Sequence, residues 1–351
     1  MTTVVGEPPL IRLPMGEEAH EPPEARGLRR DAVRLMVSRG DQESIHARFA
    51  DLPRFLGAGD LLVVNTSATL PAAVDAHTPD GTNVRIHVST PLPAELWLVE
   101  ARHPRGAASE PLSRDLRGIT VALPGGGTVE FLQRYTGSMR LWLASMHVQG
   151  SVADYLQQWG QPIRYPYVSE EWPIDAYQTV YATEPGSAEM PSAGRPFTPE
   201  VITALVAHGV VVVPLVLHTG VSSLEGDEEP YPEPFSVPGH TARRINETRA
   251  AGRRIVAVGT TVVRALESVV DSSGIVHPGS GWTDVVVTRE RGVGSVDGLI
   301  TGFHDPVASH LHLLEAFATR QVLEDAYVAA RNLGYRWHEF GDSHLILRDH
   351  D

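Results

Sequence analysis

The sequence has no cysteine among its 351 residues. A disulfide framework, a thiolate nucleophile and a cysteine-ligated zinc or iron–sulfur site are therefore excluded. No segment approaches the ~18 consecutive apolar residues that a membrane-spanning helix needs. Residues 1–14 also lack a basic segment followed by an apolar one. We therefore expect a cytoplasmic protein with no membrane partner, whose chemistry comes from groups other than thiols.

Several common catalytic motifs are missing as well. There is no G-x-S-x-G nucleophile elbow and no G-x-x-x-x-G-K phosphate loop, and residues 292–298 miss the G-x-G-x-x-G spacing. Sixteen histidines invite a metal site, but His310 and His312 stand two apart on an expected helix and point to different faces. Hydrolase and dinucleotide-binding functions thus have no motif support, and we expect no bound metal.

The net charge of the whole chain disfavours a nucleic-acid partner. Forty-three acidic residues against 29 basic ones leave a net charge of −14, which repels a polyphosphate unless cations gather on one face. Arg26, Arg29, Arg30, Arg34 and Arg39 do cluster along the chain. They form either a solvated basic face beside a strand or a patch for an anionic ligand.

The chain contains two kinds of sequence pattern. In residues 71–148, short alternating segments are separated by Gly, Pro and Asp turns, which predicts a small all-β module, a barrel or a sandwich. Residues 1–70 and 149–351 alternate buried strands with amphipathic helices, which is typical of an α/β domain. Ser151 and Thr198 are expected to cap the helices that follow them, and the last long helix is expected over about residues 308–332. We therefore predict a mixed-sheet α/β domain, 1–70 with 149–351, carrying a small β-barrel domain inserted at 71–148.

Residues 255–267, Ile-Val-Ala-Val-Gly-Thr-Thr-Val-Val-Arg-Ala-Leu-Glu, predict a strand, a tight turn and a helix. Gly259 permits a sharp turn and a close approach to a ligand, and Thr260 or Thr261 is expected to cap the helix. The free amide groups of such a helix start attract an anion. The alternative is an ordinary strand–helix unit without a ligand.

Polar residues follow other expected strands. Asn65 ends the strand of residues 61–65 and forms a polar trio with Thr66 and Ser67. His218 and His304 each follow an apolar run beside a glycine. Ligands collect at the carboxyl ends of strands in α/β sheets, so these residues are candidate walls of a site. Each histidine either transfers protons or makes a structural hydrogen bond. The long irregular, aromatic passage of residues 162–194 is expected to line the pocket.

As a set, these segments resemble the S-adenosylmethionine:tRNA ribosyltransferase-isomerase family of queuosine biosynthesis. The similarity follows the family order over nearly the whole chain, and each short segment alone is weak. The matching segments are Gly59-Asp-Leu-Leu-Val-Val-Asn65, Tyr177-Gln-Thr-Val-Tyr-Ala182, Pro191-Ser-Ala-Gly194 with Phe197-Thr198, Leu217-His218 with Gly220, Val258-Gly-Thr-Thr-Val-Val-Arg264 with Leu266-Glu267, Val296-Asp with Leu299-Ile-Thr301 and Phe303-His304, and Tyr335 with Gly341-Asp342.

The resemblance implies that S-adenosylmethionine is the co-substrate and that its ribosyl carbons pass to a 7-aminomethyl-7-deazaguanine base in tRNA, releasing adenine and methionine. It implies proton transfer by His218 or His304, with Thr260 and Thr261 holding the methionine carboxylate. It also implies that Tyr177 or Tyr181 stacks on adenine. The remaining cofactor-binding positions that it implies are Asn65, Gln178, Ser192, Ala193, Gly194, Gly259 and Arg264.

The chain departs from the family pattern near the expected acceptor. Ala68 and Ala73 stand where the family usually has arginines, and Arg195 and Gly302 replace its usual residues. These differences leave two alternatives beside tRNA modification: an enzyme with the same donor and a small-molecule acceptor, or a non-catalytic S-adenosylmethionine-binding protein. We expect tRNA binding to be weak, with a shallow dependence on salt.

Overall fold

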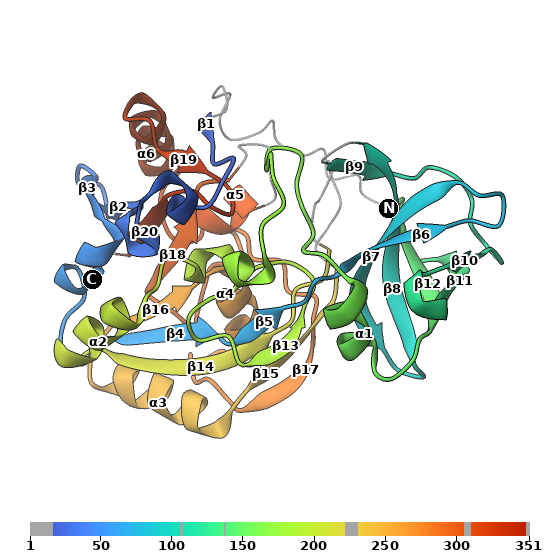
Figure 1. Cartoon of the computed structure of the whole chain (residues 1–351). Helices are drawn as coiled ribbons and strands as arrows, with labels where there is room; N and C mark the ends of the chain where they lie inside the picture. The colour runs from blue at the N-terminus through green and yellow to red at the C-terminus, as the bar shows by residue number, and fades with distance from the viewer. Residues whose placement is uncertain (1–16, 106–107, 137, 222–230, 305–309, 349–351) are drawn as a thin grey trace.

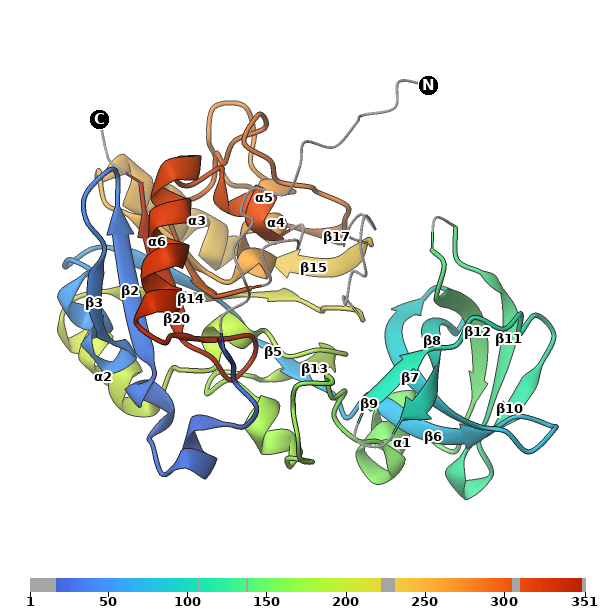
Figure 2. The same ribbon diagram turned by 90° about the horizontal axis from the view of Figure 1, so that it is seen from above.

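The computed structural model describes residues 17–105, 108–136, 138–221, 231–304 and 310–348 (Figure 1). They form a larger α/β body and a smaller barrel that lies beside it, and Figure 2 shows the two connected near β5, β13 and α1. Within these ranges, no helix is long and apolar enough to cross a membrane.

A mixed sheet of nine strands organises the larger body within the described residues, in the order β17-β15-β14-β4-β16-β18-β20-β2-β3. Its central strands are parallel: β14 (Val211–Leu217), β4 (Leu61–Asn65), β16 (Ile255–Val258) and β18 (Gly298–Gly302). The flanking strands are β15 (Glu233–Val237), β17 (Gly279–Thr283), β20 (Ser343–Leu347), β2 (Arg34–Arg39) and β3 (Ile45–Arg48). The carboxyl ends of the parallel strands share one edge, where the candidate site lies.

Both faces of this sheet are covered, which explains why β4 and β16 are buried along their whole length. Leu61 and Val63 of β4 pack with α3 (Gly239–Ala250), α4 (Thr260–Glu267), α5 (His310–Leu314) and α6 (Arg320–Asn332). Leu62 and Val64 point to the opposite face, where α2 (Pro199–Ala207) packs. Thr198 caps α2 through its side chain, as the sequence predicts.

The last helical region is interrupted, although its periodicity predicts one helix over about residues 308–332. The side chain of Thr319 accepts a hydrogen bond from the Val322 amide, so α6 starts afresh at Arg320. Residues 308 and 309 lie outside the described ranges. A capping hydroxyl thus competes with continuation of the helix.

The barrel uses antiparallel strands in the order β12-β11-β10-β6-β7-β8-β9, and a further pairing of β12 with β8 closes it. The strands are β6 (Ala73–His77), β7 (Asn83–Leu92), β8 (Leu96–Arg105), β9 (Ala108–Pro111), β10 (Thr120–Ala122), β11 (Thr128–Arg134) and β12 (Leu141–His147). Phe131 and Trp142 meet edge to face in its core, with ring centroids 5.7 Å apart. The predicted fold class is thus confirmed, while the domain boundaries 1–70 with 149–351 and 71–148 stay a prediction.

Three segments connect barrel and sheet. The chain enters the barrel after β5 (Ser67–Thr69), which pairs with β13 (Glu184–Ser187), and it leaves through α1 (Val152–Trp159). The turn after β14 also reaches the barrel, because the Val221 amide donates to the Ser89 hydroxyl of β7 at 2.9 Å. The edge of the sheet therefore faces the barrel directly.

Candidate functional site

Asn65 connects two strand ends to a helix start. Its Oδ1 accepts hydrogen bonds from the amides of Leu217 at 3.0 Å and Ser67 at 3.1 Å. Its Nδ2 donates to the Leu217 carbonyl at 2.8 Å and lies 3.4 Å from the Thr261 hydroxyl. Since both ends of the side-chain amide are engaged, Asn65 fixes β4, β14 and α4 relative to one another.

His218 lies at the end of a chain of hydroxyl groups. Its Nδ1 is 2.7 Å from the Ser67 hydroxyl, which is 2.6 Å from the hydroxyl of Ser187. The Thr219 amide donates to the same Ser187 hydroxyl at 3.0 Å. Burial lowers the pKa of His218, and the nearby Glu184 carboxylate opposes this shift only in part. A neutral imidazole results, held through Nδ1. In the tautomer in which Nδ1 donates to the Ser67 hydroxyl, Nε2 can accept a proton from a ligand.

Gly186 makes room for this ring. A Cβ atom at Gly186 would lie 2.5 Å from His218 Nδ1, well inside van der Waals contact. The backbone of β13 therefore packs directly against the imidazole and limits how it can turn. The sequence alone gives no sign of this contact.

The start of α4 is uncapped by any side chain. Gly259 occupies the N-cap position with φ 90°, a conformation that favours glycine, so the prediction that Thr260 or Thr261 caps the helix is wrong. Both threonines already lie in the first turn, where their hydroxyls are past the capping position. A Cβ at Gly259 would lie 3.5 Å from the Cβ of Ala193. The free amides of α4 thus open beside the turn of Ser192–Gly194.

Eight residues form what we call the strand-end cluster: Asn65, Ser67, Ser187, Ala193, His218, Gly259, Thr260 and Thr261. The described contacts join these residues at one edge of the sheet. Six of them were predicted from sequence. Ser67 was expected only as part of a polar trio, and Ser187 was missed because its partner lies 120 positions away.

The two tyrosines expected at adenine lie apart. Tyr181 contacts Gly194 through its hydroxyl and meets Phe197 edge to face, with centroids 5.8 Å apart. Tyr177 is buried and packs against Phe340 at 5.3 Å. Tyr181 therefore borders the strand-end cluster, while Tyr177 belongs to the junction between sheet and barrel.

Gln178 and Arg264 hold backbone segments in place. The amide of Gln178 donates to the Thr69 carbonyl at 2.8 Å and accepts from the Thr69 amide at 3.0 Å. Arg264 pairs with the buried carboxylate of Glu233, which accepts from the Gly220 amide at 2.9 Å. Burial raises the pKa of Glu233, and the Arg264 guanidinium opposes the shift. Both side chains position the segments that flank His218.

His304 belongs to a different group of rings. Its ring is 6.4 Å from that of His338, which stacks on Tyr167 at 4.6 Å. The Tyr167 hydroxyl donates to Glu339, and burial raises the pKa of Glu339 to about 7. His338 has φ 69°, a strained value for a non-glycine residue. Glu339 and His338 are site candidates that the sequence did not reveal.

The two predicted catalytic histidines are well separated. His218 follows β14 and His304 follows β18, and β4 and β16 lie between these strands. At about 4.8 Å per strand, the two strand ends are roughly 14 Å apart. His218 is linked to the start of α4 through Ser67 and Asn65, whose Nδ2 lies 3.4 Å from the Thr261 hydroxyl. His304 follows β18, the direct neighbour of β16 in the sheet.

The arginines of residues 26–39 do not form a free patch. Arg29 pairs with Asp31 at 2.6 Å and Arg30 pairs with Glu24 at 3.0 Å. The guanidinium groups of Arg26, Arg34 and Arg39 donate to the backbone carbonyls of Phe340, Leu333 and Phe55. These contacts favour the structural alternative for the basic cluster. Among the described side chains, no group of three or more His, Asp or Glu is placed to hold a metal ion.

Comparison with known proteins supports this architecture. The profile of the family described as queuosine biosynthesis protein matches residues 11–346, and the chain belongs to this family. It is 37% identical to the S-adenosylmethionine:tRNA ribosyltransferase-isomerase of Moorella thermoacetica over 354 residues, covering 95% of this chain and 97% of the relative. The enzyme of the same description from Thermus thermophilus is 38% identical over 331 residues, covering 91% of this chain and 93% of the relative.

A solved structure is also similar. The crystal structure of S-adenosylmethionine tRNA ribosyltransferase from Thermotoga maritima matches with a TM-score of 0.51 and 28% identity, covering 94% of this chain and 96% of that one. The sequence resemblance and the fold class are therefore confirmed.

Proposed function

We propose that this chain is an S-adenosylmethionine:tRNA ribosyltransferase-isomerase. It transfers the ribosyl carbons of S-adenosylmethionine to a 7-aminomethyl-7-deazaguanine base in tRNA, and adenine and methionine leave. The full-length similarity to relatives of that description supports this function. A tRNA substrate places the protein in the cytoplasm.

One observation carries the assignment to a site: a neutral, oriented imidazole lies at the same sheet edge as an uncapped helix start. The reaction needs a base to remove a proton from the ribose carbon beside the sulfonium, whose positive charge makes that proton acidic. The acceptor amine attacks the ribosyl group to form the new C–N bond, and adenine and methionine are the leaving groups. Nε2 of His218 is the base in this proposal. Ser67 and Ser187 fix the orientation of its imidazole ring.

The donor occupies the start of α4. The carboxylate of the methionine moiety accepts hydrogen bonds from the amides of Thr260 and Thr261, where the helix dipole favours negative charge. Gly259 permits the close approach, and Ser192, Ala193 and Gly194 form the opposite wall. Tyr181 borders that wall and takes the adenine side in this arrangement.

The acceptor enters from the barrel side. His218 is followed by Thr219, Gly220 and Val221, and a Cβ at Gly220 would lie 2.7 Å from the Ser89 hydroxyl of β7. The residues after His218 thus pack closely against β7, and in this proposal the acceptor base approaches His218 from the barrel side. His304, which follows β18, is three strands away from His218. In this proposal it contributes through the group of rings that it forms with His338 and Tyr167.

Incubation with S-adenosylmethionine, with and without tRNA that carries the aminomethyl base, tests the function by mass analysis. The expected result is adenine, methionine and a tRNA mass gain that all require the modified tRNA. His218→Asn should slow the formation of these products by about 10²- to 10⁴-fold. His208→Asn, a change at an exposed histidine at the end of α2, should not slow it. Turnover with a small amine and none with tRNA would favour the small-molecule alternative.

A further inference from the structure

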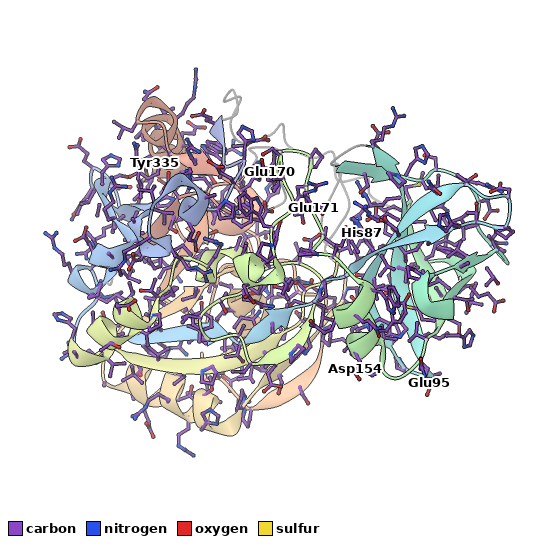
Figure 3. All side chains as sticks on the ribbon, in the orientation of Figure 1. His87, Glu95, Asp154, Glu170, Glu171 and Tyr335 are labelled. Atoms are coloured by element: carbon purple, nitrogen blue, oxygen red, sulfur yellow. The ribbon has the colours of Figure 1, made fainter. Side chains whose placement is uncertain are left out.

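A cavity of about 370 Å³ lies at the junction of barrel and sheet. It is bounded by β7, the end of α1 and part of the irregular passage 162–194, and its volume falls within the range of ligand pockets, about 300–1,000 Å³. In Figure 3, Glu171 on the larger body and His87 on the barrel mark the two sides of this junction. The side chains that matter are Arg85, Gln157, Gln161, Arg164, Trp172 and Tyr177.

Two arginines in the lining pair, among the described residues, with exposed acids. The Arg85 side chain is 15% exposed and pairs at 2.8 Å with Asp75, whose side chain is 56% exposed. Arg164 is 11% exposed and lies 3.7 Å from Glu171, which is 66% exposed. Since ion pairs with solvated carboxylates contribute little, both guanidinium groups remain available to an anion in the cavity.

Other donors also point to a ligand. The Nε1–H of Trp172 is buried, and among the described residues it has no hydrogen-bond partner. A buried donor without an acceptor is costly, so the site favours a ligand that supplies one. Gln157 and Gln161 add amides that match the mixed donor and acceptor edge of a nucleobase. Trp172 and Tyr177 are aromatic surfaces of the kind on which bases stack.

The charge of the lining distinguishes between the two substrates. S-adenosylmethionine carries a sulfonium, an ammonium and one carboxylate. The charged lining consists of two arginines and the carboxylate of Glu171, so the donor meets more like charge than opposite charge there. A ribonucleotide instead combines a planar base with a phosphate, which arginine binds with bidentate geometry. The cavity thus fits RNA and does not fit the donor.

The cavity adjoins the strand-end cluster. Thr69 of β5 donates through its hydroxyl to the carbonyl of Tyr177, which lines the cavity. Ser67, the partner of His218, lies two residues earlier on the same strand, about 7 Å at 3.3 Å per residue. A nucleotide in the cavity therefore lies within a few nucleotide lengths of a base that reacts at His218.

We propose that this cavity binds a nucleotide of the tRNA that flanks the modified base, with one backbone phosphate on Arg85, a second on Arg164, and its base against Trp172. The inference rests on the proposed function and adds the place where the RNA is held. The barrel would contribute to tRNA binding mainly through Arg85.

Titration of tRNA against Arg85→Gln and Arg164→Gln at several salt concentrations tests the site. Each variant should lower affinity about tenfold and reduce the magnitude of the salt slope by about 1, since each loses one phosphate contact. Arg117→Gln, an exposed arginine of the barrel with the same charge change, should stay within about twofold. Thermal unfolding of each variant checks that the fold is intact.

A measurement on the unaltered protein supplies a second test. Adenosine 5′-monophosphate should compete with tRNA, adenosine should compete at least about tenfold less, and Trp172→Phe should lose the fluorescence change on nucleotide binding. Unchanged tRNA affinity and slope in both arginine variants would overturn the inference, as would equal competition by adenosine. If tRNA binds as expected but the protein never modifies it, the proposed function fails while the nucleotide site stands.

Discussion

The strand-end cluster and the junction cavity differ in how their polar groups are satisfied. In the cluster, Asn65, Ser67 and Ser187 bond to one another or to the backbone, so the groups that face a ligand in this account are the His218 ring and the first turn of α4. In the cavity, Arg85, Arg164 and Trp172 have weak partners or none among the described residues. The cluster is therefore built for orientation, and the cavity for charge and stacking.

Charge is also distributed unevenly between residues 71–148 and the rest of the chain. Residues 71–148 hold seven arginines and seven acidic residues, so the rest of the chain carries the whole net charge of −14. The chain has no lysine, and each cation is an arginine. An approaching RNA is repelled least on the barrel side, where the cavity lies.

The largest expected effect concerns the base. His218→Asn should lower kcat by about 10²- to 10⁴-fold, the usual contribution of a general base, and change the affinity for S-adenosylmethionine by less than about threefold. Single-turnover kinetics with saturating tRNA measure this change. A greater loss in His304→Asn than in His218→Asn would move the chemistry to the ring group of His338 and Tyr167.

The next effect concerns the donor site. Gly259→Ala should weaken S-adenosylmethionine binding at least about tenfold, and its strained backbone should cost about 1–3 kcal/mol of stability. Gly252→Ala is the matched control, because Gly252 also has a positive φ, 64°, but an added Cβ there meets no atom within 4 Å. Calorimetry and thermal unfolding of the pair separate affinity from stability. Equal affinities in the two variants would show that no ligand approaches Gly259.

A pH profile sharpens the assignment of His218. Burial lowers its folded pKa, so the neutral, active form persists below the ordinary histidine value of about 6.5. We expect kcat/KM to stay level through pH 6.5 and to fall only at lower pH, by about tenfold per pH unit. An acid limb centred above pH 7 would require a different base.

The smallest expected effect is that of salt on the affinity for the donor, S-adenosylmethionine. Between 50 and 200 mM salt, affinity for S-adenosylmethionine should change by less than about twofold, because the cluster offers dipoles and no free cation. Affinity for tRNA should fall with a slope of magnitude about 2, set by the phosphates on Arg85 and Arg164. A slope of magnitude near 6 would indicate a larger basic surface than the cavity provides.

Local signals in the sequence predicted much of the fold. Ser151 before α1 and Thr198 before α2 cap their helices as expected, since a capping hydroxyl needs only residues a few positions away. The alternating segments of residues 71–148 and the strand at 255–258 were also predicted, because alternation and short apolar runs are local signals too. Two local predictions were wrong: Gly259, not a threonine, occupies the N-cap of α4, and the helix expected over about residues 308–332 is interrupted before Arg320.

Contacts between distant segments explain what the sequence did not reveal. The hydrogen bond of Ser67 to His218 spans 151 positions, and Arg264 binds a carboxylate on a neighbouring strand. Periodicity describes which face a side chain occupies but not which partner it meets there. The arginines of the cavity likewise come from different segments, so their proximity depends on the packing of barrel against sheet.

Binding of S-adenosylmethionine to the double variant Arg85→Gln with Arg164→Gln tests most directly whether donor and RNA have separate sites. If the donor occupies the strand-end cluster, calorimetry should give a Kd within about twofold of the unaltered protein. A loss of tenfold or more, in a variant that unfolds at the same temperature as the parent, would place the donor in the cavity and contradict the division between the two regions.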